Sequence, residues 1–346
     1  MNNASPNTKK SNFAKNHPVI SFLLITFAWT WLFWLAAIPF RSQNDLLVMS
    51  MVMVGGFGPA LAGIVTLAWA NGSKPDFSGK KILILGASAL VIFAVMAWRY
   101  QLGNIADFQT LAQDLTLSMP ILVLSAAACL VGGWVISSAV SKNSSVRSGM
   151  ASILPTRLSL GWTLFAFFSF TGMILLSWGV STLLGIPVEY PPLWGRSILE
   201  VGPIFLSVFL LTALAQGGNE EPGWRGFLQP ALQKRFNPLV AALIVSLFWS
   251  LWHLPLYLNG FYPGDLLQGM LGSGIYRILL AILLAWVYNR SGNNIFLMVI
   301  LHTTFNVMVN FLPVSDGILL ILWLLLVIAI IIKDKMYRKL PENPLG

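Results

Sequence analysis

The chain has 346 residues, of which 56% are hydrophobic and only 10% are charged. Because a soluble protein of this size carries about 25% charged residues, the composition excludes a water-soluble globule and predicts a polytopic membrane protein. The net charge of +9 does not indicate a nucleic-acid partner, because the basic residues lie between apolar runs, where they orient a protein in the bilayer.

Ten apolar runs of spanning or near-spanning length follow one another along the chain. Their approximate ranges are 19–40, 46–70, 82–98, 119–140, 160–184, 198–216, 238–258, 270–288, 294–312 and 317–332. The third run is short for a membrane span, and the ninth contains a histidine and asparagines. No small-residue cleavage site follows the first run, so we expect no cleaved signal peptide. The pattern predicts an all-α, polytopic transmembrane bundle of about ten helices.

The positions of lysine and arginine predict the orientation of this bundle. With the N-terminus in the cytoplasm, 17 of the 21 basic residues fall on the cytoplasmic side, in the termini and in alternate loops. Arg225 belongs to this group, in the loop predicted after the sixth run. Arg277 lies within the eighth run, and the predicted outer loops hold only Arg41, Arg99 and Arg196. This asymmetry predicts that both termini face the cytoplasm.

The segment 101–118, between the third and fourth runs, is more polar than its neighbours. Its spaced apolar residues, among them Ile105, Phe108 and Leu111, fit an interfacial helix on the outer face. A plain extracellular loop fits equally well.

Charged residues interrupt the apolar pattern in the stretch 216–235, which contains Glu220, Glu221 and Arg225. Ionisable groups are costly at membrane depth and are rarely placed there without a function. Glu221 and Arg225 are four residues apart, so they can form an ion pair that lowers the cost of burying both. Glu220 has no such local partner, and this suits a general base. The pair Gly217-Gly218 permits a break in the helix just before them.

Two of the three histidines, His253 and His302, lie inside apolar runs, whereas His17 precedes the first run and is expected at the surface. One intramembrane histidine is readily explained by a hydrogen bond between helices, but two together with the acidic stretch favour a functional site. His302 and Asn306 share a helix face because they are four residues apart. His253 lies about 22 Å along the seventh run and His302 about 12 Å along the ninth. Both histidines can reach Glu220 only if the seventh helix begins below the membrane surface or tilts strongly, or if the site lies deep in the membrane.

Three segments resemble, in order, the motifs of the CPBP family, the intramembrane proteases related to the type II CAAX prenyl endopeptidase and also called the Abi family. They are EEPGWRGFLQPAL from Glu220, LFWSLWHLP around His253, and VYNRSGNNIFLMVILHTTFN ending at Asn306. Trp249 stands where the family usually has phenylalanine, so we expect the packing to differ more than the chemistry. The resemblance implies a catalytic core at 198–312, after an N-terminal transmembrane region (1–195) of open role and before a last helix and cytoplasmic tail (313–346).

The resemblance implies hydrolysis of a peptide bond in a membrane-associated protein or peptide, at the plasma membrane of a bacterium. It implies that Glu220 and His253 orient and deprotonate a water molecule, and that His302 and Asn306 donate hydrogen bonds to the oxyanion. Arg225 would hold Glu221 and shape the site. The expected partners are the lipid bilayer and a protein or peptide substrate.

A catalytic zinc ion is the alternative to catalysis by glutamate alone, and Glu220, His253 and His302 are its candidate ligands. Because Cys129 is the only cysteine, a zinc site built on four cysteines, or on two cysteines and two histidines, is excluded. No HExxH helix is present, and Asn306 beside His302 is better suited to an oxyanion donor than to a metal ligand. The residues therefore favour the metal-independent mechanism.

Two other function classes compete with the protease. A transporter would also bury charges in broken helices, but the runs show no repeat and the polar residues cluster in one region. A non-catalytic, protective family member could instead bind a peptide such as a bacteriocin, although every motif position is retained.

Overall fold

The computed structural model describes residues 13–41, 45–72, 76–102, 115–156 and 158–341. Within these ranges the chain is helical apart from loops and one isolated bridge between Glu189 and Val314, which confirms the predicted all-α class. The helices outside the motif region are α1 (Phe13–Asn16), α2 (Pro18–Ala36), α3 (Asp45–Gly56), α4 (Gly58–Ala70), α5 (Gly79–Leu102), α7 (Leu115–Ser137), α8 (Ser144–Met150), α9 (Leu160–Leu184) and α17 (Asp316–Lys333).

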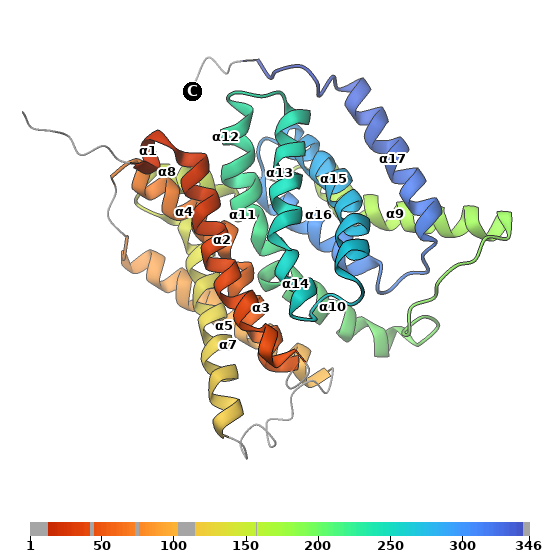
Figure 1. Ribbon diagram of the computed structural model, residues 1–346, viewed down its shortest axis with the longest axis horizontal. Coiled ribbons are helices and arrows are strands. Elements are labelled where there is room, and N and C mark those ends of the chain that lie inside the picture. The colour runs from red at the N-terminus through yellow and green to blue at the C-terminus, as the bar shows by residue number, and fades with distance from the viewer. Residues whose placement is uncertain (1–12, 42–44, 73–75, 103–114, 157, 342–346) are drawn as a thin grey trace, which may run out of the picture.

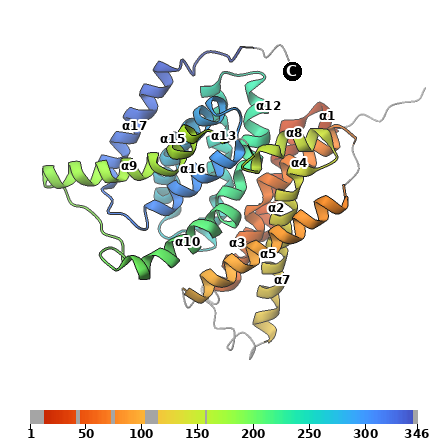
Figure 2. The same ribbon diagram turned by 180° about the vertical axis from the view of Figure 1, so that it is seen from behind.

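The motif region forms a second set of helices, connected by short irregular turns. They are α10 (Ile198–Ala215), α11 (Glu221–Gly223), α12 (Gln229–Gln233), α13 (Pro238–Trp252), α14 (Leu254–Leu258), α15 (Leu266–Arg290) and α16 (Ile295–Met308). In both views the helices α11 to α16 lie between the group α2 to α7 on one side and α17 on the other (Figures 1 and 2). The motifs therefore occupy the middle of the bundle.

Nine helical segments among the described residues are long and apolar enough to cross a membrane. They correspond to nine of the ten predicted runs, and the ninth run is the shorter apolar helix α16, with 14 residues. The third run is longer than predicted, because α5 continues through polar residues at both ends to reach 24 residues. Most of the segment predicted as an interfacial helix or loop, 103–114, lies outside the described residues.

The sixth run does not end at residue 216 as predicted. After α10 the chain continues through a 3-10 turn, α11, a π turn and α12, so that one helical segment extends from Ile198 to Gln233. Arg225 lies inside this segment with a fully buried side chain, and its assignment to a cytoplasmic loop was wrong. The predicted orientation keeps its support, because 16 basic residues then remain on the cytoplasmic side against three on the outside.

The same correction brings the catalytic candidates to one depth. Glu220 lies 13 residues before the end of α12, and His253 follows α13 at 15 residues from its start, which places both about 20 Å from the connection between these helices. The N-cap residue of α16, Asn294, is buried within the protein. His302 on α16 lines the same cavity as Glu220, so the two side chains meet in the interior of the bundle.

The N-terminal helices pack directly on the motif region. A Cβ atom at Gly223 would lie 2.2 Å from the backbone carbonyl carbon of Pro59, so α11 and α4 approach more closely than any side chain at this position allows. Phe22 of α2 packs its ring against those of Trp224 and Phe227. Helices from 1–195 thus pack against the predicted catalytic core. The division of the chain at residue 195 stays a prediction.

We expect a reporter that is active only outside the cell to remain silent when it is fused after Gly346. The reason is the excess of basic residues in the loops assigned to the cytoplasm. In Figure 1 the helices α1, α8 and α12, which adjoin these basic segments, lie at the upper end, and α17 ends there as well. The same reporter inserted in the 186–197 loop should be active. Activity of the C-terminal fusion would show that the helix count or the orientation is wrong.

Candidate active site

The site is built around a break in the helical segment at Gly217. This residue has φ +149°, in the region that favours glycine. A Cβ atom there would lie only 2.6 Å from Nδ2 of Asn306 and 3.7 Å from Nε2 of His302. A 3-10 turn over Gly218–Glu220 and a π turn over Trp224–Leu228 follow, and such irregular turns are frequent at functional sites. The predicted break is confirmed.

Glu221 is the partner of two cationic or potentially cationic groups. Arg225 Nη1 donates to Glu221 Oε1 at 3.0 Å, with both side chains fully buried, as the spacing predicted. The same oxygen lies 2.7 Å from Nδ1 of His302. A carboxylate accepts hydrogen bonds, so Nδ1 carries the proton and Nε2 is left on the side of Asn306. The contact joins residues 81 positions apart, which spacing along the sequence cannot reveal.

Trp249 contacts Glu220, Arg225 and His302. Its indole Nε1 donates to Oε2 of Glu220 at 2.6 Å, and the Arg225 guanidinium lies over its ring at 4.7 Å. The edge of the ring also packs against His302. A phenylalanine could fill this space but could not donate the hydrogen bond. Whether this residue changes packing more than chemistry stays a prediction, but Glu220 has a partner that was not predicted.

His253 stands at the end of α13, where its ring is held in one orientation. Nδ1 lies 2.7 Å from the carbonyl oxygen of Trp249, one helical turn earlier. Because a carbonyl only accepts, Nδ1 is the protonated nitrogen and Nε2 keeps a lone pair. The ring of Tyr262 stacks on the imidazole at 5.9 Å and 14°. His253 is thus fixed as an acceptor at Nε2.

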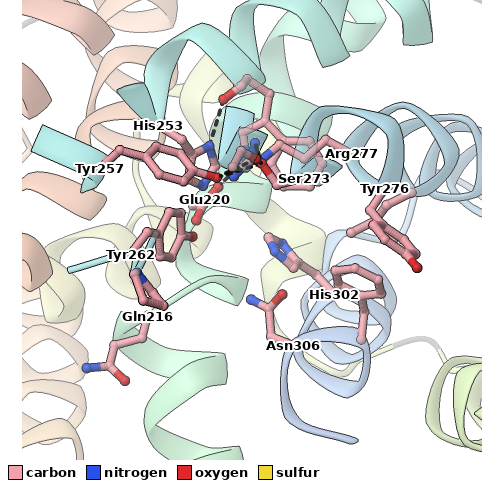
Figure 3. A pocket seen from close by; sticks show the side chains of 15 residues that line it. Gln216, Glu220, His253, Tyr257, Tyr262, Ser273, Tyr276, Arg277, His302 and Asn306 are labelled. Carbon is pink, nitrogen blue, oxygen red and sulfur yellow. Dashed lines mark hydrogen bonds between the residues drawn. The ribbon is translucent and has the colours of Figure 1, made fainter. Parts of the chain in front are cut away.

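All four predicted catalytic residues, Glu220, His253, His302 and Asn306, line one cavity of about 410 Å³. In the view of Figure 3, Glu220 and His253 lie above His302 and Asn306. Glu221 and Arg225 do not line the cavity; they form the fully buried ion pair described above, and their supporting role stays a prediction. The lining also includes residues that were not predicted as part of the site: Gln216, Trp249, Tyr257, Tyr262, Pro263, Gly269, Ser273, Tyr276, Arg277, Leu280 and Phe305.

The candidate zinc ligands do not form a metal centre in this arrangement. Among the described residues no three side chains of His, Cys, Asp or Glu come close enough to hold one metal ion. One ring nitrogen of His302 is already engaged by Glu221, and one of His253 by a backbone carbonyl. No step of a mechanism is therefore assigned to a metal here.

Replacing Trp249 by phenylalanine should lower turnover about tenfold or more, because a hydrogen bond to a charged group contributes about 1.5–3 kcal/mol. Most of the buried ring is retained, so the melting temperature should fall only slightly. Trp323→Phe is the matched control, because this tryptophan is fully buried, its indole nitrogen has no partner among the described residues, and it does not line the cavity. Equal turnover in both variants would contradict a role of the indole N–H.

A cavity lined by a carboxylate, two imidazoles and an amide, inside an all-helical membrane bundle, defines a candidate intramembrane hydrolase. Residues 202–308 match the family model described as type II CAAX prenyl endopeptidase Rce1-like, so this part of the chain is similar to that family of proteases. The curated "CAAX prenyl protease 2" of Methanococcus maripaludis is 30% identical over 139 residues. The match covers 38% of this chain and 51% of the relative, so the chain spans about half the length of that protein.

Proposed function

We propose that the protein is an intramembrane endopeptidase that hydrolyses a peptide bond of a membrane-associated protein or peptide, with water activated by Glu220. The observation that carries the proposal is the single cavity that Glu220 and His253 share with His302 and Asn306. The family match over residues 202–308 supports the same reaction class. The proposed location is a bacterial plasma membrane, with both termini in the cytoplasm.

The first step is the attack of water on the peptide carbonyl carbon. Glu220, oriented by the Trp249 N–H, takes one proton from the water, while Nε2 of His253 accepts a hydrogen bond from the other. A C–O bond forms and the carbonyl becomes an oxyanion. In the second step the C–N bond breaks, and Glu220 returns its proton to the leaving amine. The base is therefore restored at the end of each turnover.

The oxyanion is stabilised from α16. Asn306 donates through its side-chain amide, and His302 donates through Nε2 when the ring carries both protons. The Glu221 carboxylate accepts from Nδ1 and so fixes the orientation of the ring. When the ring carries both protons, the two carboxylates, Glu220 and Glu221, are balanced by Arg225 and His302. A neutral cluster lowers the cost of placing four charges at membrane depth.

A comparison of new peptide termini in membranes that contain the wild type or Glu220→Ala tests the proposal. Cleavage products present only with the wild type are expected. Equal products in the two samples, with both proteins folded and inserted, would favour the binding-only or transporter alternatives. Binding of a peptide without cleavage by the wild type would point to the protective role.

Exhaustive chelation of the purified protein should leave its activity unchanged, because the favoured mechanism uses only protein groups. The measurement is the cleavage rate before and after treatment with a strong chelator, with metal content determined in parallel. Loss of activity that is restored by zinc would replace this mechanism with a metal-dependent one.

A further inference from the structure

Arg277 brings a second buried arginine into the molecule, outside all three motifs. It lies in the middle of α15, is only 7% exposed and lines the same cavity as Glu220. Charged groups at membrane depth usually pair with one another or mark a pathway for substrate. The ion pairs among the described residues join Glu221 to Arg225, Glu221 to His302, and Arg290 to Asp334. Arg277 belongs to none of them.

Neutral groups hold one edge of the Arg277 guanidinium. Nη1 donates to the hydroxyl of Ser273 at 2.7 Å, and that hydroxyl donates to the carbonyl of Gly269 at 2.6 Å. The hydroxyl of Tyr257 contacts the same two groups, at 2.7 Å from Ser273 Oγ and 3.0 Å from the Gly269 oxygen. This network fixes the direction of the guanidinium but does not balance its charge.

The carboxylate of Glu220 does not serve as the missing counter-ion. Glu220 is the one acidic residue among the described residues that line the cavity. Its Oε2 accepts from Trp249, and no oxygen of Glu220 lies within the 4.0 Å of an ion pair with Arg277. Figure 3 shows Arg277 beside Ser273, away from Asn306. The cavity therefore contains a positive charge that the catalytic groups do not neutralise.

We propose that Arg277 binds a carboxylate of the peptide substrate and thereby selects which peptide bond lies at Glu220. This assignment rests on the proposed peptidase function. A guanidinium recognises a carboxylate through two parallel hydrogen bonds, and a peptide carries carboxylates at its C-terminus and on aspartate and glutamate side chains. A cavity of about 410 Å³ is large enough for a short part of such a peptide. Binding supplies the charge balance that the free cavity lacks.

The test measures binding in a catalytically inactive background, so that it does not depend on cleavage. The probe is a set of fluorescent apolar hexapeptides in three forms: free C-terminal acid, C-terminal amide, and amide with one internal glutamate. Each form is titrated against Glu220→Gln and against Glu220→Gln combined with Arg277→Gln. We expect at least about tenfold tighter binding of one carboxylate-bearing form than of the plain amide, and loss of that preference with Arg277→Gln.

The preferred form identifies the source of the carboxylate, the free acid indicating a peptide C-terminus and the internal glutamate a side chain. Arg196→Gln in the same background is the matched control, because this exposed arginine does not line the cavity, and the preference should survive there. Compared with Arg277→Gln, Arg277→Lys should restore part of the preference, since lysine returns the positive charge but not the paired N–H donors of the guanidinium. Melting temperatures show that each variant is folded.

Three results would overturn the assignment. They are equal binding of the three forms, no measurable binding of any form, and an equal loss of binding for all forms with Arg277→Gln. The same peptides are incubated with the wild type. Carboxylate-dependent binding without cleavage by the wild type would refute the peptidase and leave the role of Arg277 standing. Cleavage without any carboxylate preference would refute the role of Arg277 alone.

Discussion

Glu220→Gln should turn over substrate at least about 100-fold more slowly than the wild type, because an amide cannot accept the proton of the attacking water. The glutamine has the same shape, and its oxygen can still accept from the Trp249 indole, which donates at 2.6 Å in the wild type. The variant should therefore fold, insert and bind peptide normally. Turnover, peptide affinity and melting temperature in detergent are the three measurements.

Glu189→Gln is the control for the loss of a carboxylate, since this exposed residue does not line the cavity. It should keep wild-type turnover. If Glu220→Gln unfolds the protein while Glu221→Gln is stable and inactive, the roles of the two adjacent glutamates are reversed.

Glu221→Gln should destabilise the protein, because it leaves the Arg225 guanidinium buried without its counter-charge. Breaking a buried pair costs about 3–5 kcal/mol, so yield and melting temperature should both fall, and Arg225→Ala should have a similar effect. The double variant should be less unstable than the two single losses added together. Additive losses would show that the two side chains do not act as a pair.

The contact between Glu221 and His302 adds an expectation that the sequence alone did not support. Without the carboxylate that accepts from Nδ1, the His302 ring loses the hydrogen bond that fixes its orientation toward Asn306. The folded fraction of Glu221→Gln should therefore also turn over more slowly, whereas a purely structural role of Glu221 would lower activity only in proportion to unfolding. Activity per folded molecule, compared with that of Arg225→Ala, distinguishes the two expectations.

Local spacing in the sequence predicted those parts of the site that lie on one turn of helix. The ion pair of Glu221 with Arg225 and the shared face of His302 and Asn306 are of this kind, because residues four apart meet on any helix. Long apolar runs predicted the spanning helices for a similar reason, since membrane thickness fixes their length. These features depend on periodicity alone.

Contacts between distant segments could not be predicted in this way. The bond from Trp249 to Glu220 joins residues 29 positions apart, and its only sequence signal was an unusual aromatic residue in a motif. Arg277 gave a clearer signal, as a charge within an apolar run, but its neighbours on α14 and α15 are single polar residues without a pattern. The sequence pattern did not predict the continuation of α10 into α12, because charged residues usually mark the end of a membrane span. Here Glu221 and Arg225 are buried by tertiary packing inside the helical segment.

The close approach of Gly223 to Pro59 bears on how such a protein can be shortened or recombined. Next to the fully buried pair of Glu221 and Arg225, Gly223 packs on α4 and Trp224 packs on α2. A chain that began at residue 198 would lack both helices and would expose this side of α11 to lipid. An ion pair that borders on hydrocarbon is costly, because charged groups are strongly disfavoured at membrane depth. We therefore expect the motif region to require α2 and α4, which separate its buried charges from the surrounding lipid.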